Sequence, residues 1–562
     1  MMADSDVIVG IDLGTTNSLV AVVQGGHPRI LPIDGSPLLP SVVGVDERGQ
    51  RIIGQTARNQ YVAAPERTVR SIKRHMGEPG YRVRLGDAEY TPEEISAFIL
   101  RRLADAASEQ LGVEVRRVVI TIPAYFADRQ RQATMRAGEL AGLEVVRLLH
   151  EPTAAALVYG MGKADAENAL VYDLGGGTFD VSVVEVGAGL TEVRASHGNR
   201  QLGGDDFDQL IVDELVRDFE AEHKVDLRRD KLAMARLVRA AEAAKIHLSD
   251  HPYVEIREEF LTSSRHGRPL HLEAELSRDR FEELIEPHLL DTLEAVRRAL
   301  KDSQLDPRAL DSVLLVGGST RIPAVRELIS KDLGREPRQD IHPDEAVALG
   351  AAVQAAAIAG EDVDSVLVDV CPHSLGIRAI SIRGGVQDDD AFVPLIHRNT
   401  VIPVSKSEFF YTVTPEQSEV DIEVFQGEEP VASRNTHLGD LTFTGLSKNG
   451  DRQREVLVAF DYDVNGILHV AAIDRKSGKR TEAHLHTVSL EAVAESAAAG
   501  ELSTLLSRLR KMEGDDLSEE VRSSLQTLIA QGEDVAAVKD SERIDAWQEQ
   551  AADFLLDHGG EY

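Results

Sequence analysis

The sequence predicts three structural regions: an α/β region, an antiparallel β region and a short α-helical bundle. Up to about residue 360, β-branched apolar runs alternate with helical stretches, which is typical of an α/β domain. From about 366 to 485, short segments of alternating polarity are separated by Asn-Gly and Gly-rich turns. After residue 489, apolar residues recur at helical spacing. We expect domains at 1–362, 371–488 and 489–562, with an interdomain linker at 363–370.

The α/β region contains a repeated motif. Ile-Asp-Leu-Gly-Thr-Thr-Asn begins at Ile11, and Tyr-Asp-Leu-Gly-Gly-Gly-Thr begins at Tyr172. Each copy lies between two β-like runs, so we expect both copies to form the tips of β-hairpins. The glycines do not open a helix and the sequence lacks GxxxxGK[ST], which disfavours a Rossmann fingerprint and a Walker P-loop.

Two such tips are suited to binding a polyphosphate. Glycine lets several backbone N–H groups approach one anion, and neighbouring hydroxyls add hydrogen-bond donors. Asp12 and Asp173 each end the strand before a tip, where a carboxylate near phosphate is favourable chiefly when Mg²⁺ or its bound water lies between them. The predicted phosphate-binding residues are Gly14, Thr15, Thr16, Asn17, Gly175, Gly176 and Gly177.

Two further glycine pairs fit a nucleotide site. Gly317 and Gly318 follow a predicted strand and precede a predicted helix, which suits contact with a nucleotide's sugar or α-phosphate. Gly203 and Gly204 lie just before a helix predicted to begin at Asp205.

The regions after residue 362 are less distinctive. Residues 364–370 are an apolar run bounded by acidic residues, which predicts either a linker able to dock or the first strand of the β region. Ser489 is a candidate helix N-cap. The apolar positions expected to form the core of the helical bundle are Leu502, Leu505, Leu506, Leu509, Val521, Leu525, Leu528, Trp547, Phe554 and Leu555.

Composition excludes several other classes of protein. The 95 acidic residues outnumber the 61 Lys and Arg residues, and a formal charge of −34 argues against nucleic acid as a partner. Cys371 is the single cysteine, so an intramolecular disulfide is excluded, in keeping with a reducing compartment. The N-terminus lacks the features of a signal peptide, and the apolar segment at 346–359 is too short for a bilayer and predicts a buried helix. We therefore expect a cytoplasmic protein without membrane contact.

Several motifs, in order along nearly the whole chain, resemble the DnaK-type heat-shock 70 chaperones. They are Gly-Ile-Asp-Leu-Gly-Thr-Thr-Asn-Ser at 10–18, Ile-Pro-Ala-Tyr-Phe at 122–126, Glu-Pro-Thr-Ala-Ala-Ala at 151–156 and the turn at 173–180. This resemblance implies an actin-like ATPase domain with two lobes around an ATP cleft, followed by a β-sandwich that binds peptides and a helical lid.

The resemblance also implies roles for individual residues. Lys73 would orient the attacking water or stabilise charge on the γ-phosphate of ATP. Glu151 and Thr178 would position that water, and Asp12 and Asp173 would hold hydrated Mg²⁺. The residues that resemble the family's adenosine clamp are Glu242, Lys245, Ser249, Gly317, Ser319, Arg321 and Asp344.

In the β region, the family binds extended polypeptides through main-chain hydrogen bonds and an apolar cleft. The residues that align with this cleft are Ile377, Ile380, Phe410, Val413, Val420 and Ile422. The sequence alone favours a core position in a strand for each of these residues, so their assignment to the cleft rests on the resemblance.

The sequence departs from DnaK at several places. The segment 77–90 and the C-terminal helical part are short, and both features, with Asp-Val-Cys-Pro-His-Ser-Leu-Gly at 369–376, resemble the HscC-type branch. His150 replaces an Asn near the surface that binds J-domain co-chaperones, whereas Arg147 and Asp369 match the family. The implied partners are extended client polypeptides, a J-domain protein and a nucleotide-exchange factor.

These features predict a chaperone whose grip on polypeptides is controlled by ATP binding and hydrolysis. One alternative is a sugar or small-acid kinase of the same fold, which leaves residues 366–562 without a role. Another is a holdase or regulatory protein that binds ATP without hydrolysing it, although Lys73, Glu151 and Thr178 are all present.

Overall fold

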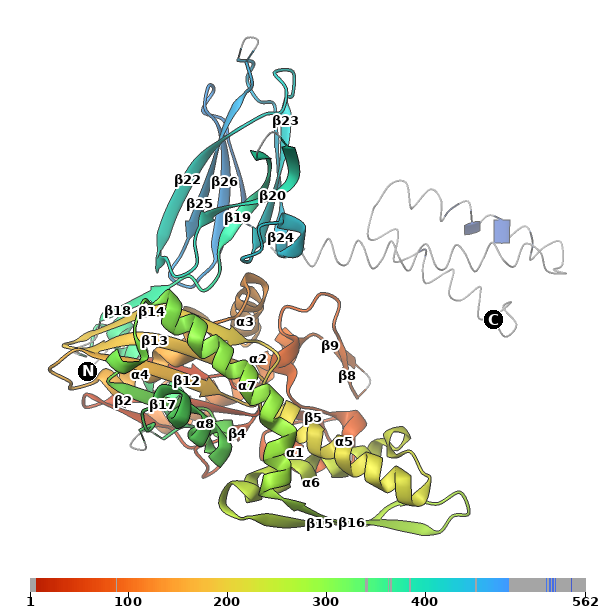
Figure 1. The fold of residues 1–562 in the computed structure, drawn as a ribbon. Coiled ribbons are helices and arrows are strands. Elements are labelled where there is room, and N and C mark those ends of the chain that lie inside the picture. Colours follow the sequence, from red (N-terminus) through yellow and green to blue (C-terminus); the bar gives the residue numbers. More distant parts are fainter. Residues whose placement is uncertain are drawn as a thin grey trace. The chain divides into compact units, whose positions relative to one another are not determined.

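The structure is a computed structural model that describes residues 7–86, 88–338, 342–361, 363, 366–383, 386–449 and 452–484, with a few positions between 522 and 547. The chain divides into two compact units, Met1–Leu485 and His486–Tyr562. In Figure 1 the larger unit contains mixed α/β sheets with covering helices, followed along the chain by antiparallel strands.

The first sheet has the strand order β11-β10-β1-β2-β3, and β4 pairs with β2. β1 is parallel to β10 and antiparallel to β2, so the hairpin predicted at the first motif is confirmed. The strands of this sheet are β1 (Ile8–Asp12), β2 (Asn17–Gln24), β3 (His27–Ile30), β4 (Leu39–Pro40), β10 (Arg117–Ile122) and β11 (Glu144–His150).

The second sheet has the order β17-β12-β13-β14-β18-β21. β12 is antiparallel to β13 and parallel to β17, which repeats the arrangement of β1, β2 and β10. The repeated sequence motif therefore marks a structural repeat, and the second predicted hairpin is also confirmed. The strands are β12 (Glu167–Leu174), β13 (Phe179–Gly187), β14 (Leu190–Asn199), β17 (Ser312–Val316), β18 (Val366–Val370) and β21 (Val401–Ile402).

Helices α4 (Glu151–Gly160) and α9 (Ala346–Ala359) share one hydrophobic cluster with residues of both sheets. α9 is the buried Ala-rich helix that the sequence predicts. Small residues permit its close contacts: a Cβ on Gly350 would lie 1.8 Å from the carbonyl oxygen of Ala154, and one on Gly10 would lie 2.2 Å from the backbone nitrogen of Ala352. These contacts bring the strand before the first motif against α9, and α9 against α4.

Of the further helices, α2, α3 and α7 pack directly against the two sheets. α2 begins with a capping box in which the Thr91 side chain accepts from the N–H of Glu94 and the Glu94 side chain accepts from the N–H of Thr91. The further helices are α1 (Gln55–Tyr61), α2 (Pro92–Leu111), α3 (Asp128–Leu140), α5 (Gly204–His223), α6 (Lys231–Asp250), α7 (Arg278–Asp302) and α8 (Pro323–Leu333).

Short elements complete this part of the chain. The 3₁₀ turns are η1 (Pro65–Arg67), η2 (Ile72–His75), η3 (Leu227–Arg229), η4 (Pro307–Ala309) and η5 (Gly318–Arg321). The small sheets comprise β5 (Val43–Val45) with β6 (Arg51–Ile53) and β7 (Thr68–Val69), β8 (Val83–Leu85) with β9 (Ala88–Tyr90), and β15 (Tyr253–Ser263) with β16 (Pro269–Ser277).

The β region forms two four-stranded antiparallel sheets, ordered β20-β19-β23-β24 and β22-β25-β26-β27. Both sheets contribute to one hydrophobic cluster, which includes Ile377 and Val424 from one sheet and Val458 and Phe460 from the other. The predicted antiparallel pairing is confirmed. The elements are β19 (Leu375–Arg383), β20 (Val386–Ile396), β22 (Val404–Tyr411), β23 (Glu419–Gln426), η6 (Ala432–Arg434), β24 (Thr436–Thr444), β25 (Glu455–Tyr462), β26 (Leu468–Asp474) and β27 (Arg480–His484).

Residues 364–370 are predicted to be either a linker able to dock or the first strand of the β region, and the strand β18 has features of both. Its first part, from Val366 to Val368, pairs in parallel with β14 of the second sheet. Its last two residues, Asp369 and Val370, pair with β21, which lies between β20 and β22 of the β region. One short strand therefore connects the two parts by backbone hydrogen bonds.

Most of the predicted helical bundle lies outside the described residues, including Ser489, Leu502, Leu505, Leu506, Leu509, Val521, Phe554 and Leu555. Leu525, Leu528 and Trp547 are helical and buried. The Trp547 indole N–H donates to the carbonyl of Leu528 at 2.9 Å. Among the described residues, no helix is long and apolar enough to span a bilayer.

Candidate functional site

The two hairpin tips, defined here as the first tip (residues 12–17) and the second tip (residues 173–178), contact one another. A Cβ on Gly176 would lie 2.0 Å from Thr16 Oγ1, and one on Gly177 would lie 2.9 Å from Thr15 Oγ1. The glycines of the second tip therefore make room for the threonines of the first tip. The structure brings together the phosphate-binding residues that the sequence predicts on the two tips.

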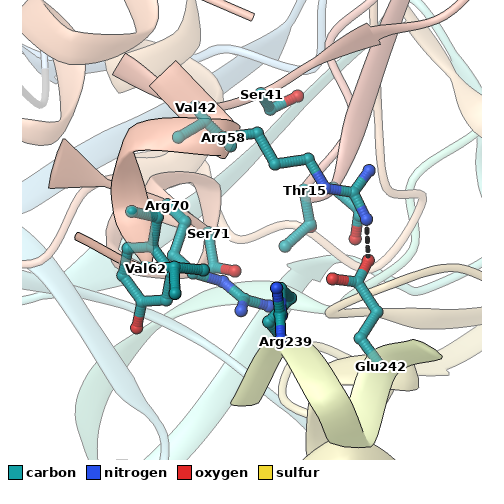
Figure 2. Close-up of a pocket in the computed structure, with 11 residues that line it drawn as sticks. Thr15, Ser41, Val42, Arg58, Val62, Arg70, Ser71, Arg239 and Glu242 are labelled. Atoms are coloured by element: carbon teal, nitrogen blue, oxygen red, sulfur yellow. Dashed lines mark hydrogen bonds and ion pairs between the residues drawn. The ribbon is translucent and has the colours of Figure 1, made fainter. Parts of the chain in front are cut away.

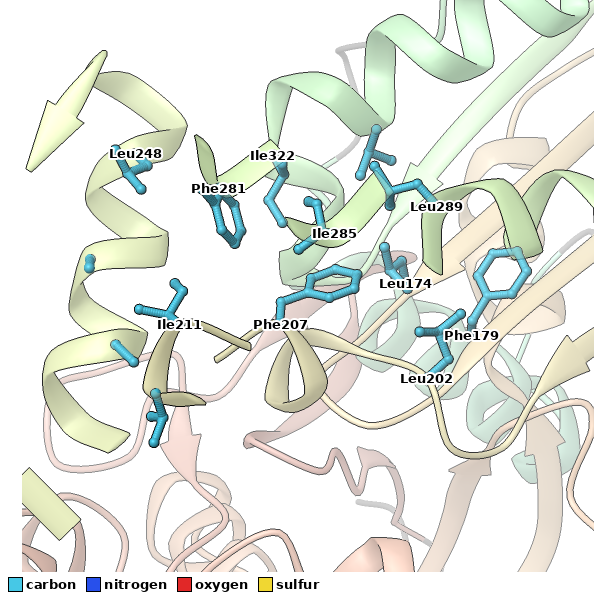
Figure 3. Packing of buried hydrophobic residues seen from close by; sticks show 14 of the residues in the cluster. Leu174, Phe179, Leu202, Phe207, Ile211, Leu248, Phe281, Ile285, Leu289 and Ile322 are labelled. Atoms are coloured by element: carbon cyan, nitrogen blue, oxygen red, sulfur yellow. The ribbon is translucent and has the colours of Figure 1, made fainter. Parts of the chain in front are cut away.

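Buried residues on either side hold the second tip in place. Leu174 and Phe179 precede and follow its glycine-rich turn, and both belong to the cluster that includes Phe207 and Leu289. Figure 3 shows the Leu174 and Phe179 side chains near Leu202, Phe207 and Leu289. The turn itself has little apolar surface to bury, so its position depends on these flanking anchors.

Several buried carboxylates gather behind the tips. Burial and the negative charge of Glu151 raise the pKa of Asp12 to about 7. Burial, Glu151 and Asp180 raise the pKa of Asp173 well above its ordinary value. Burial and Glu151 raise the pKa of Asp180 to about 8. Since burial penalises the charged form, these groups need a compensating cation to remain ionised near neutral pH.

Lys73 and Glu151 form a buried ion pair beside this group. Lys73 Nζ lies 2.6 Å from Glu151 Oε1, and both side chains are almost fully buried. Lys73 is on η2 and Glu151 opens α4, so the pair joins two segments that are far apart in sequence. Thr178 is buried at the end of the second tip, and its carbonyl accepts the N–H of Gly175 at 3.0 Å.

The residues present fit a magnesium ion. Asp12 interacts electrostatically with Glu151, Lys73 and Asp344. Asp173 interacts in the same way with Asp12, Glu151, Asp180 and Lys73. The group thus contains five carboxylates and one lysine. Mg²⁺ prefers oxygen ligands and retains several waters, so a hydrated ion beside Asp12 and Asp173 would offset the excess negative charge.

Most residues of the predicted adenosine clamp lie on α6 and around η5, next to the second tip. Lys245 Nζ lies 3.0 Å from the carbonyl oxygen of Gly204 and 2.9 Å from Asp208 Oδ1. Arg321 pairs with Asp344 at 2.6 Å. Gly318 is next to Asp344 as well, since a Cβ on it would lie 3.2 Å from Asp344 Oδ1.

Glycines bring these elements close to the second tip. Gly317 has a positive φ of 82°, and a Cβ there would lie 2.5 Å from the carbonyl oxygen of Leu174. A Cβ on Gly203 would lie 2.5 Å from the backbone of Gly176. Gly203 is the N-cap of α5, which begins at Gly204, one residue before the predicted start. The helix expected after Gly318 is a 3₁₀ turn first, and α8 begins only at Pro323.

Two clamp residues have other partners in this structure. Glu242 Oε1 accepts from Arg58 Nη2 at 2.8 Å, which joins α6 to α1. Ser249 Oγ lies 3.5 Å from the carbonyl oxygen of Lys245, one turn earlier on α6, so its hydroxyl is engaged within its own helix. The sequence does not indicate the Arg58 contact, because the two residues are far apart along the chain.

A pocket lies beside the first tip, and the Arg58–Glu242 ion pair crosses it (Figure 2). It is lined by Thr15, Thr16, Ser41, Val42, Arg58, Tyr61, Val62, Arg70, Ser71, Arg239 and Glu242. Three arginines line this pocket, and each is paired with a carboxylate: Arg58 with Glu242, Arg70 with Asp205 and Arg239 with Glu258.

The predicted peptide-cleft residues differ in exposure and lie apart from the tips, in the β region. Ile377 and Ile422 are buried in its core, and Phe410 and Val420 pack against that core. Ile380 is 46 % exposed and Val413 is 59 % exposed, so these two are available to a ligand. Their role in binding stays a prediction.

Sequence reasoning missed two residues near the carboxylate group. Asp180 lies directly opposite Asp173 in the β12–β13 pairing, and two residues after Thr178, so the register of the predicted hairpin contains a signal for it. Thr121 donates its hydroxyl proton to Asp12 Oδ1 at 2.9 Å. It lies opposite Asp12 in the parallel β1–β10 pair, a non-local contact that leaves no local sequence signal.

The duplicated sheets, the paired tips and the buried carboxylates form an arrangement suited to an anionic, metal-associated ligand. A family model described as Hsp70 protein matches residues 8–83 and 78–553. The chain belongs to the Hsp70 family. Members of this family are chaperones and ATPases that bind nucleotide with Mg²⁺, client polypeptides and J-domain co-chaperones. The mixed sheets fit the family's actin-like ATPase lobe, and the kinase alternative is not favoured.

Proposed function

We propose that this protein is a chaperone that binds extended hydrophobic polypeptide segments with an affinity set by ATP binding and hydrolysis. The observation that carries this proposal is the contact between the two tips, with Asp12, Asp173, Glu151 and Lys73 gathered behind them. The proposed domains are the ATPase domain at 1–362, the linker at 363–370, a β-sandwich at 371–488 and a shortened helical lid at 489–562.

In the proposed site, the tips bind the phosphates of ATP through backbone N–H groups and the hydroxyls of Thr15 and Thr16. Asp12 and Asp173 hold hydrated Mg²⁺, which screens the charge of the phosphates. Lys73 stabilises charge on the γ-phosphate, while Glu151 and Thr178 orient the attacking water. Glu242, Lys245, Ser249, Arg321 and Asp344 contact the nucleoside, together with the backbone around Gly317.

Replacing Lys73 tests this assignment. We expect Lys73→Ala to lower ATP turnover by about 100-fold or more, because removing one charge that stabilises a transition state has effects of this size. MgATP affinity should change by less than about fivefold, since the tips remain intact. Single-turnover release of phosphate and calorimetric titration measure the two quantities. Unchanged turnover would remove Lys73 from the proposed catalytic residues, whereas absence of turnover in the unmodified chain would favour a protein that senses ATP without hydrolysing it.

The linker strand is the proposed connection between ATP and client binding. β18 pairs with both β14 and β21, and Leu367 packs against the cluster that contains α4 and α9. Because α4 begins with Glu151, displacement of β18 would reach the proposed catalytic carboxylate through this shared packing. Two sites biased by one shared element must affect each other, so bound peptide should change ATP turnover.

Two linker variants provide a matched test. Leu367→Asp would place a charge in the cluster and should abolish the effect of a short Leu-rich peptide on ATP turnover. Val366→Asp is the control, because Val366 is 62 % exposed and its replacement should preserve at least half of that effect. Equal peptide stimulation in both variants and the unmodified chain would exclude this route.

Arg147, His150 and Asp369 lie near the surface proposed to bind a J-domain protein, and His150 and Asp369 are themselves buried. His150 Nδ1 lies 3.1 Å from Asp369 Oδ1, and His150 Nε2 lies 2.8 Å from Arg131 Nη1. These contacts commit both ring nitrogens of His150, so the packing beneath that surface differs from that of the amide found at this position in most relatives. We assign the protein to the short HscC-like branch and to the cytoplasm, with a nucleotide-exchange factor as a further partner.

A further inference from the structure

Ser41 holds two carbonyl groups of the first tip. It follows β4 and is almost fully buried. Ser41 Oγ donates to the carbonyl of Gly14 at 2.8 Å, and the backbone N–H of Ser41 donates to the carbonyl of Thr16 at 2.8 Å. Ser18 Oγ lies 2.8 Å from Ser41 Oγ. Because the Ser41 hydroxyl proton is directed at Gly14, Ser18 is the donor in that pair.

These contacts determine where the N–H groups of the tip point. In a trans peptide the C=O and the following N–H point in opposite directions. Fixing the carbonyl of Gly14 therefore turns the N–H of Thr15 away from Ser41. Fixing the carbonyl of Thr16 likewise turns the N–H of Asn17 away from Ser41. A carbonyl that rotated the other way would present a negative oxygen to any anion bound at the tip.

The second tip has the equivalent arrangement, supplied by different elements. Gly175 occupies the position in the repeat that Gly14 occupies in the first copy. Its carbonyl accepts from Ser319 Oγ at 2.9 Å and from the N–H of Gly204 at 3.0 Å. The carbonyl of Gly176 accepts from the N–H of Asp205 at 2.7 Å. The N–H groups of Gly176 and Gly177 therefore point away from Ser319 and from the start of α5.

We propose that Ser41 and Ser319 are a pair of positioning residues, one for each tip, that hold the carbonyls of Gly14 and Gly175 outward so that the following N–H groups face phosphate oxygens. This inference rests on the proposed function, because it assigns how the nucleotide's phosphates are recognised. It adds Ser41, which has no place in the predicted site, and gives Ser319 a role toward the second tip besides the predicted nucleoside contact.

Ser18 provides a matched control for Ser41. Both hydroxyls are buried and hydrogen-bonded to each other, but the hydroxyl bond to the tip carbonyl comes from Ser41. Ser18→Ala removes a buried hydroxyl and leaves the Ser41–Gly14 bond in place. Ser41→Ala removes that bond and keeps the backbone N–H that holds Thr16.

The test is calorimetric titration of the full chain with MgATP, MgADP and adenosine. We expect Ser41→Ala to weaken binding of MgATP and MgADP about tenfold, the size expected for one reoriented hydrogen-bonding group, and to change adenosine binding by less than about twofold. Ser18→Ala should change all three affinities by less than about twofold. Thermal unfolding without nucleotide checks that each variant is folded.

Two results would overturn the inference: unchanged MgADP affinity in Ser41→Ala, or an equal loss for adenosine and MgADP. If Ser41→Ala does not fold, Ser41→Cys keeps a weaker donor of similar size and should weaken only the phosphate-bearing ligands, to a smaller extent. Absence of MgATP binding by the unmodified chain would instead overturn the proposed function, and this inference with it.

Discussion

The two tips share a motif and a topology, but they meet different steric requirements. In the first tip, a Cβ on Gly14 would lie 2.0 Å from the carbonyl oxygen of Asn17, so the turn folds back on itself. At the equivalent Gly175, a Cβ would lie 3.6 Å from the carbonyl oxygen of Thr178, which is an ordinary contact. The second tip instead needs glycine at Gly176 and Gly177, where the threonines of the first tip approach.

This difference shows that the two halves are complementary rather than interchangeable. The first tip supplies hydroxyls, and the second supplies the space that those hydroxyls occupy. The residues that hold the two tips differ as well. Ser41, which follows β4 of the first sheet, holds the first tip, whereas Ser319 and the start of α5 hold the second tip. A glycine in a repeated motif therefore has to be judged by what surrounds it in its own copy.

The largest expected effect separates the two equivalent glycines. Gly14→Ala should weaken MgATP binding by about 100-fold or more, because a Cβ there overlaps backbone that cannot move without opening the turn. Gly175→Ala should weaken it by less than about threefold. Calorimetric titration of both variants measures the contrast, with thermal unfolding as the control. Similar losses at both positions would mean that the tips are equivalent after all.

A second prediction concerns the contact between the tips. Gly176→Ala should weaken MgATP binding by about 30-fold, since its Cβ would lie 2.0 Å from Thr16 Oγ1. Adding Thr16→Ala removes that oxygen and should recover part of the loss, although Thr16→Ala by itself weakens binding. A double-mutant cycle on MgATP affinity measures this coupling. Strictly additive losses would show that the two tips do not touch in solution.

The smallest expected effect concerns the hydrogen bond that the Thr121 hydroxyl donates to Asp12. Thr121→Val removes the donor at nearly constant volume and should raise the Mg²⁺ concentration for half-maximal ATP binding by about three- to fivefold. Ser182→Ala is the control, because its hydroxyl pairs with Ser196 in the second sheet, also out of solvent. A Mg²⁺ requirement that stays the same in Thr121→Val would remove Thr121 from the metal site.

Some features followed from local sequence because local rules govern them. The hairpins around both motifs, the buried helix Ala346–Ala359 and the antiparallel strands after residue 370 are confirmed. Each depends on periodicity, turn residues or composition within a short window. Membership of the Hsp70 family follows from motifs that are contiguous in the sequence.

Other features depend on contacts between distant segments. Asp12 meets Thr121 through a parallel strand pair, and Glu242 meets Arg58 across helices α6 and α1. Ile377 and Ile422, predicted to face a peptide, are buried in the core of the β region, while Ile380 and Val413 are exposed. Which face of a strand is buried depends on the sheet that packs against it.

By itself, the sequence of this protein determined two acidic, glycine-rich turns with a shared plan, since each turn is encoded within a few consecutive residues. The tertiary structure alone decided that the turns touch, that Gly14 and Gly175 differ in the space around them, and that Ser41 and Ser319 hold equivalent carbonyls. The reason is physical: a turn's shape is set by its own dihedral angles, but the direction of its peptide groups and the room beside it are set by whatever packs against it.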